Sequence, residues 1–211
     1  MIKKILSKFQ YNAPVILTFA LISAAALLIS NLTNGWANYY IFSVYRTSLL
    51  SPMQYLRLFT HIIGHADYVH YINNFTLILL VGPMLEEKYG SRAILKMMLF
   101  TACITGIIQI IFFPKVPLLG ASGILFMLIL LSSFANFRKG RIPLTLILVA
   151  VIYLSGEIVA GLSAKNDGVS QLAHIIGGVC GTAFGWLVTK PKAEESAAEG
   201  KEESLLEQLK K

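Results

Sequence analysis

Charged residues are scarce in this chain and unevenly placed. Asp, Glu, Lys and Arg make up 14% of the 211 residues, and hydrophobic residues make up 55%. A typical water-soluble domain carries about 25% charged residues. The few charges fall in short clusters between long apolar tracts, an arrangement that excludes a soluble enzyme. The sequence therefore predicts one domain embedded in a lipid bilayer.

Cysteine is almost absent as well. Cys103 and Cys180 both lie within apolar tracts, so neither a disulfide framework nor a zinc site follows from them. We interpret both as small packing residues, and we expect no metal ion and no cofactor. The net charge of +7 does not indicate a nucleic-acid partner, because the basic residues stand between apolar tracts instead of forming one patch.

Six apolar segments are long enough, or nearly so, to cross a bilayer as helices of about 20 residues. They cover residues 14–32, 68–86, 93–113, 121–137, 142–161 and 171–189. The first has no clear cleavage site and is interpreted as an uncleaved signal-anchor. The connection over 34–67 is rich in Trp and Tyr, which favour the membrane–water boundary.

The expected architecture is an all-α membrane protein. It consists of a basic N-terminus over 1–13, a six-helix domain over 14–189 with an interfacial first loop, and a charged tail over 190–211.

Lys and Arg near the ends of these segments predict the orientation. Eleven lie on one side, and the other side has four: Arg46, Arg57, Lys115 and Lys165. The richer side is cytoplasmic by the positive-inside rule, which places both termini in the cytoplasm. His70, Ser122 and His174 then lie within a turn or two of the outer surface, with Asn74 one turn deeper beside His70. Polar groups are costly inside a membrane, so their common depth indicates a functional site.

Ser122 lies in the sequence Gly-Ala-Ser-Gly at 120–123. A nucleophilic serine needs space around its Oγ and nearby backbone N–H groups for an oxyanion. Gly120, Gly123 and a helix N-terminus supply both. On its own this tetrapeptide is more often a close-packing patch in a membrane helix.

His174 precedes glycines at 177, 181 and 185. This spacing lets another helix approach closely, and the helix that begins near Ser122 is a natural partner. A neutral imidazole at that contact could accept the serine proton. The alternative is a histidine that only hydrogen-bonds between helices. Asp67 and Asp167 lie in outer loops, so we predict a dyad without an acid.

A longer pattern, FTH-x3-H-x4-H-x3-N followed by G-x3-E-x3-GS, covers residues 59–91. Together with GASG and AHIIGGVCG, in this order, it resembles the rhomboid family of intramembrane serine proteases over about 56–186. The resemblance implies a six-helix rhomboid-like bundle. It also implies an enzyme that hydrolyses peptide bonds in or near transmembrane segments of single-span or polytopic membrane proteins.

The resemblance also implies a role for each matching residue. Ser122 would be the nucleophile and His174 the general base, and His70 and Asn74 would form the oxyanion hole with the Ser122 N–H beside Gly120. The residues with expected structural roles are His61, His65, Glu86, Gly90, Ser91, Gly177 and Gly181.

Two positions depart from the family pattern. Phe126 stands where members commonly have a tyrosine that packs on the histidine, and Leu56 replaces the tryptophan of a Trp-Arg pair. Both changes concern positioning and rate and leave the reaction class intact.

Glu157, near the outer end of the fifth segment, has two interpretations. It is an interfacial carboxylate that reaches water, or it lines the route by which substrate enters.

Two other functions stay open. An inactive relative would bind membrane proteins without cutting them, although such a protein is expected to lose the serine or the histidine. A small transporter would use the histidines as a proton relay, which gives no reason for GASG. We expect a multi-pass protein of a bacterial inner membrane, since no organelle-targeting segment is evident.

Overall fold

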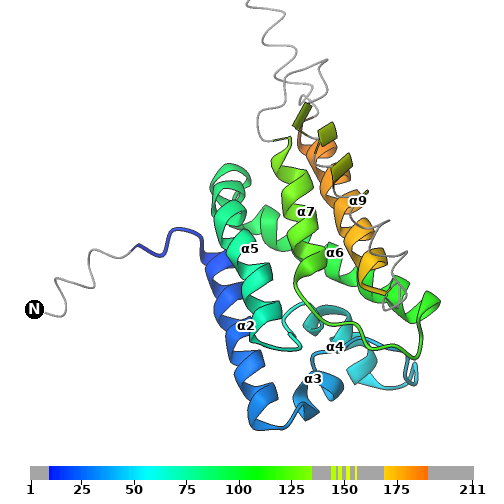
Figure 1. Ribbon diagram of the computed structural model, residues 1–211. Helices are drawn as coiled ribbons and strands as arrows, with labels where there is room; N and C mark the ends of the chain where they lie inside the picture. The colour runs from blue at the N-terminus through cyan, green and yellow to red at the C-terminus, as the bar shows by residue number, and fades with distance from the viewer. Residues whose placement is uncertain are drawn as a thin grey trace, which may run out of the picture.

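The computed structural model describes residues 10–134, 144–145, 147–148, 151–152, 155 and 169–189. Within these ranges the elements are helices, and one isolated antiparallel bridge joins Val44 to Leu118. The helices are α2 (Pro14–Leu32), α3 (Trp36–Tyr40), α4 (Pro52–Thr60), α5 (Tyr68–Tyr89), α6 (Ser91–Phe112), α7 (Ser122–Ser132) and α9 (Val169–Thr189) (Figure 1).

Four of these helices are long and apolar enough to cross a membrane, namely α2, α5, α6 and the part of α9 over Gln171–Val188. Helix α7 is apolar but is described over only 11 residues. The fifth expected segment, 142–161 with Glu157, lies largely outside the described residues. The predicted all-helical membrane bundle is therefore confirmed. That the bundle has six membrane-spanning helices stays a prediction.

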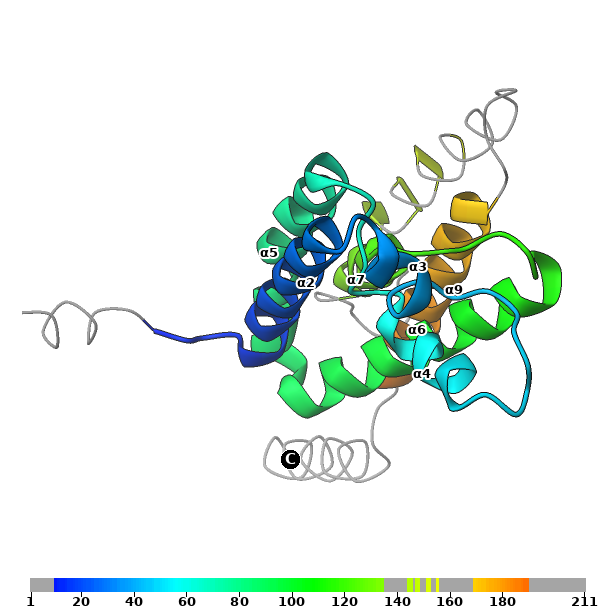
Figure 2. The same cartoon turned by 90° about the horizontal axis from the view of Figure 1, so that it is seen from below.

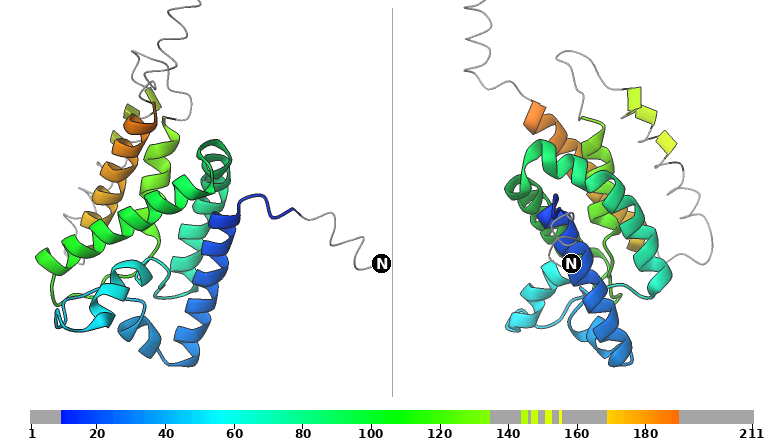
Figure 3. Two further views of the ribbon diagram at one scale, coloured as in Figure 1. Left: turned by 180° about the vertical axis from the view of Figure 1, so that it is seen from behind. Right: turned by 90° about the vertical axis from the view of Figure 1, so that its left-hand side faces the viewer.

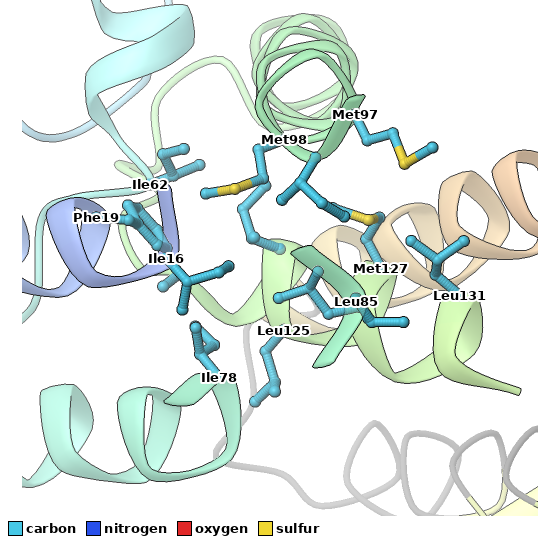
Figure 4. Packing of buried hydrophobic residues seen from close by; sticks show 14 of the residues in the cluster. Ile16, Phe19, Ile62, Ile78, Leu85, Met97, Met98, Leu125, Met127 and Leu131 are labelled. Atoms are coloured by element: carbon cyan, nitrogen blue, oxygen red, sulfur yellow. The ribbon is translucent and has the colours of Figure 1, made fainter. Parts of the chain in front are cut away.

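The helices pack in a chain of neighbours, in which α2 contacts α5, α5 contacts α7 and α7 contacts α9. Figure 2 shows α7 between the α2–α5 pair and α9, and the view from behind shows α6 crossing obliquely over α7 and α9 (Figure 3). The core where these helices meet includes Ile16 of α2, Ile78 of α5, Met98 of α6 and Leu125 of α7 (Figure 4). This arrangement fixes the position of α7, whose first residue is Ser122.

Glu86 on α5 caps the first turn of α2. Its Oε1 accepts the backbone N–H of Val15 and its Oε2 accepts that of Ile16, both at 2.9 Å, and the side chain is only 3% exposed. The first N–H groups of a helix have no partner within the helix, and a negative charge there is favoured by the helix dipole. Glu86 therefore makes a structural contact, which agrees with the structural role that the family resemblance implies.

Glu86→Gln is expected to destabilise the protein by about 1–2 kcal/mol, because two hydrogen bonds to a charged acceptor become weaker or are lost. Thermal unfolding in detergent micelles measures this change. The adjacent Glu87 is exposed, so Glu87→Gln is the matched control and should leave the unfolding temperature nearly unchanged. Equal unfolding temperatures for the two variants would contradict the capping role.

The first loop carries α3 and α4 and is held by Arg57. The Arg57 side chain is buried, its Nε donates to the Tyr40 carbonyl at 2.9 Å, and its guanidinium lies 4.4 Å from the centre of the Tyr45 ring. Leu56 beside it is exposed. The replacement of tryptophan by leucine thus falls on the outer face of the loop, and the arginine that remains makes the internal contacts.

Candidate active site

The turn before α7 brings Gly120, Ser122 and His70 together. Gly120 has φ +132°, a conformation that residues with a side chain rarely adopt. A Cβ atom there would stand 2.9 Å from both Cε1 and Nε2 of His70 and 3.9 Å from the Oγ of Ser122. Glycine is therefore needed for the backbone conformation and for the close approach of the imidazole to the serine turn.

The irregular backbone over 114–121 is tied to the rest of the protein. Arg46 N–H donates to the Pro114 carbonyl at 2.9 Å, and the backbones of Val44 and Leu118 pair with each other. Gly120 N–H donates to the His61 carbonyl at 2.9 Å. Backbone polar groups in a membrane protein need such partners, and these contacts hold the segment that leads into Ser122.

His70 and Asn74 project from the first two turns of α5. The helix begins at an N-cap, Asp67, whose carboxylate accepts the His70 N–H at 2.8 Å. One turn later Asn74 is 5% exposed, and its buried Nδ2 has no hydrogen-bond partner within the described part of the chain. Asn73 is exposed. Asn74 is thus the amide that faces the protein interior, and it has a donor to offer.

The glycines of α9 pack against the backbone of α7. A Cβ atom on Gly177 would overlap the Gly123 carbonyl, and one on Gly181 would overlap the Met127 carbonyl. The expected close packing at Gly177 and Gly181 is therefore confirmed. The backbones of α7 and α9 are in direct contact at these positions, because glycine has no side chain to keep them apart.

His174 lies on α9 one turn before Gly177 and meets the face of α7 that carries Ser122. Its ring contacts the Phe126 ring, with 4.7 Å between the centroids and 43° between the planes. Phe126 is one turn after Ser122, so the two share a face of α7. Both Ser122 and His174 are half-buried. The fold thus places the Ser122 hydroxyl, the His70 imidazole and the His174 imidazole near the start of α7, with the buried amide of Asn74 one turn beyond His70 on α5.

The sequence was compared with models of known protein families. The model described as the Rhomboid domain matches residues 52–191, more than half of the chain. This chain belongs to the rhomboid family. A search of curated proteins finds no match. The family and the four apolar helices identify a multi-pass integral membrane protein.

Phe126 of this rhomboid makes the ring contact with His174 that was expected of an aromatic residue at this position. The tilted contact with His174 needs only the aromatic face and edge. The missing hydroxyl therefore removes a hydrogen-bonding group and leaves the packing of the histidine in place.

His61 and His65 lie in the connection that leads into α5 and are both buried. Burial lowers the pKa of each imidazole to about 4, because a charged ring loses its hydration there. Both rings are consequently neutral near pH 7. The Nδ1 of His61 lies 3.0 Å from the Arg57 carbonyl and its Nε2 lies 3.3 Å from the Thr105 hydroxyl.

Two contacts at the site of this rhomboid could not be predicted from the sequence. Thr105 on α6 is the partner of His61, and the N–H of Ala121 points to Nε2 of His65 at 3.4 Å. Neither Thr105 nor Ala121 carries a charge or a distinctive spacing. Among the described residues, no group of three or more His, Cys, Asp or Glu could hold a metal ion.

Proposed function

We propose that this rhomboid is an intramembrane serine protease that hydrolyses peptide bonds in or near the transmembrane segments of other membrane proteins. Ser122 is the nucleophile and His174 is the general base. The observation that carries the proposal is the contact between the His174 and Phe126 rings, which sets the histidine against the face of α7 that begins with Ser122.

The first step is attack by the Ser122 Oγ on the substrate carbonyl carbon, while His174 takes the hydroxyl proton. His174 then gives this proton to the leaving amine, and an acyl-enzyme forms. Water, deprotonated by the same histidine, releases the acyl group and regenerates the serine. Both groups are half-buried and lie on helices that pack together, which supports this proton transfer.

The negative charge on the attacked carbonyl oxygen is stabilised by donors around the Gly120 turn. The Ser122 N–H is one of the N–H groups at the start of α7 that have no partner within the helix, and the His70 imidazole packs directly on Gly120. Asn74 supplies the third donor, its unpartnered buried Nδ2. A buried donor without a partner costs about 1–3 kcal/mol, and binding an oxyanion would recover this energy.

The substrate must present an extended backbone at this site. A transmembrane helix has its carbonyl groups bonded internally, so it has to unwind before a serine can reach one. Substrates with Gly or Pro near the outer membrane boundary unwind most readily. We propose an orientation with both termini in the cytoplasm of a bacterial cell, which places the start of α5, α7 and α9 on the outer side of the inner membrane.

The test is cleavage of a fluorescently labelled single-span protein by the full chain reconstituted in liposomes. The wild type should release a fragment cut near the outer boundary, and Ser122→Ala should release none. The Ser132 hydroxyl, on the same helix, donates to the Ile129 carbonyl of its own helix. Ser132→Ala is therefore the matched control and should cut normally. Undiminished cleavage by Ser122→Ala would rule out the proposed nucleophile.

A further inference from the structure

His65 is fully buried, and each of its ring nitrogens meets a backbone group. Nε2 lies 3.4 Å from the Ala121 nitrogen, and Nδ1 lies 3.2 Å from the Ile63 carbonyl oxygen. A backbone N–H can only donate and a carbonyl can only accept. Nε2 must therefore hold the lone pair and Nδ1 the proton, which fixes one neutral tautomer of the imidazole.

The ring of His65 also supports the side chain of His70. The two imidazoles meet edge to face, with centroids 5.0 Å apart. Tyr71 and Phe75 of α5 close the other sides of the His65 ring at 5.5 Å each. The backbone is held too, because Asn38 Nδ2 donates to the His65 carbonyl at 2.7 Å. Contacts with Asn38 of the first loop and with Tyr71 and Phe75 of α5 thus fix the position of His65.

The His65 imidazole therefore contacts two parts of the site proposed to bind the oxyanion: the backbone before Ser122 and the side chain of His70. Ala121 is the residue directly before Ser122, so an acceptor on its N–H holds the Gly120–Ala121 peptide unit, which is next to the unit that carries the Ser122 N–H. The same ring limits the movement of the His70 imidazole beside Gly120. Catalytic donors act best when they are aligned before charge develops on the oxyanion.

We propose that His65 is a positioning residue for the oxyanion donors. Its Nε2 holds Ala121, and with it the Ser122 N–H, while its ring holds the His70 imidazole. This inference rests on the protease function proposed above. It separates His65 from His61, whose ring meets Thr105 and whose carbonyl alone reaches the turn.

Three substitutions separate acceptor geometry from packing. In His65→Gln the side-chain oxygen reaches the place of Nε2 and can still accept the Ala121 N–H. In His65→Asn the same amide is one bond shorter and reaches only the place of Nδ1. His65→Leu removes both polar atoms. Each full-length variant is reconstituted in liposomes, and kcat, KM and the thermal unfolding temperature are measured.

His65→Gln should keep a kcat several-fold above that of His65→Asn, because it keeps the acceptor for the Ala121 N–H although it loses the ring beside His70. His65→Asn and His65→Leu should lower kcat about 10- to 100-fold. This decrease is no larger than the decrease expected when one oxyanion donor is removed outright. KM should not change, because the substrate in its ground state carries no oxyanion. His61→Leu is the matched control. It should lower the unfolding temperature of this buried site while kcat of the folded protein stays near the wild-type value.

The inference is overturned if His65→Asn and His65→Gln have equal kcat, if the loss appears only in KM, or if His61→Leu lowers kcat as strongly. If His65→Leu does not fold, the comparison of kcat between His65→Gln and His65→Asn still tests the inference, because both side chains end in the same amide group. A wild type no faster than Ser122→Ala would overturn the protease function as well. If the wild type cleaves the substrate and His65→Asn has the same kcat as the wild type, the positioning role is overturned and the protease function is not.

Discussion

Replacing His174 with alanine is expected to lower the rate of substrate cleavage by about 10⁴-fold or more, as far as replacing Ser122 does. The two side chains act in the same step. Without the imidazole the Ser122 hydroxyl keeps its proton and is a poor nucleophile, and without the hydroxyl the imidazole has no proton to take. Ser122→Ala combined with His174→Ala should therefore be no slower than either single variant.

Initial rates on the labelled single-span substrate, measured for the two single variants and the double variant, test this prediction. Thr182 on α9 lies two turns beyond His174, and its hydroxyl bonds to the Gly178 carbonyl. Thr182→Ala therefore controls for the loss of a small polar contact on the same helix and should cut at the wild-type rate. Multiplicative effects of the two substitutions would show that the serine and the histidine act in separate steps.

The sequence located the helices well wherever apolar character and helix length coincide. Residues 14–32 were predicted as one segment, and α2 covers the same range. The second segment was predicted to end at residue 86, but α5 continues to Tyr89. Glu87 and Lys88 are polar, so hydropathy marked the end of the membrane part. The helix itself ends where Gly90 takes φ +84°, a backbone property that hydropathy does not report.

Within the candidate site, the residues that follow helical spacing could be predicted and those in the loop could not. The glycine spacing on α9 predicted its close packing on the helix of Ser122, and the overlap at Gly177 and Gly123 confirms it. The contact of His65 with Ala121 joins two irregular segments far apart in the sequence. No periodicity relates such segments, because their backbone is set by tertiary contacts alone.

Gly177→Ala is expected to separate α9 from α7 and to lower both stability and activity. The added methyl group would overlap the Gly123 carbonyl, which is backbone and cannot rotate away as a side chain can. Overpacking of this kind costs about 1–3 kcal/mol. The displaced helix carries His174, and a shift of about 1 Å at a catalytic group costs about 10²-fold in rate.

Gly123→Ala is the matched control, because it adds the same methyl group to the opposite side of the same contact. Its Cβ would lie 3.4 Å from the Ala173 carbonyl oxygen, near ordinary van der Waals distance. Its unfolding temperature should therefore stay close to that of the wild type, while that of Gly177→Ala falls. Equal unfolding temperatures for both variants would mean that the two backbones are not in contact at Gly177. A fall in stability without a fall in kcat would mean that His174 keeps its place when α9 moves, so that the helix contact and the dyad are independent.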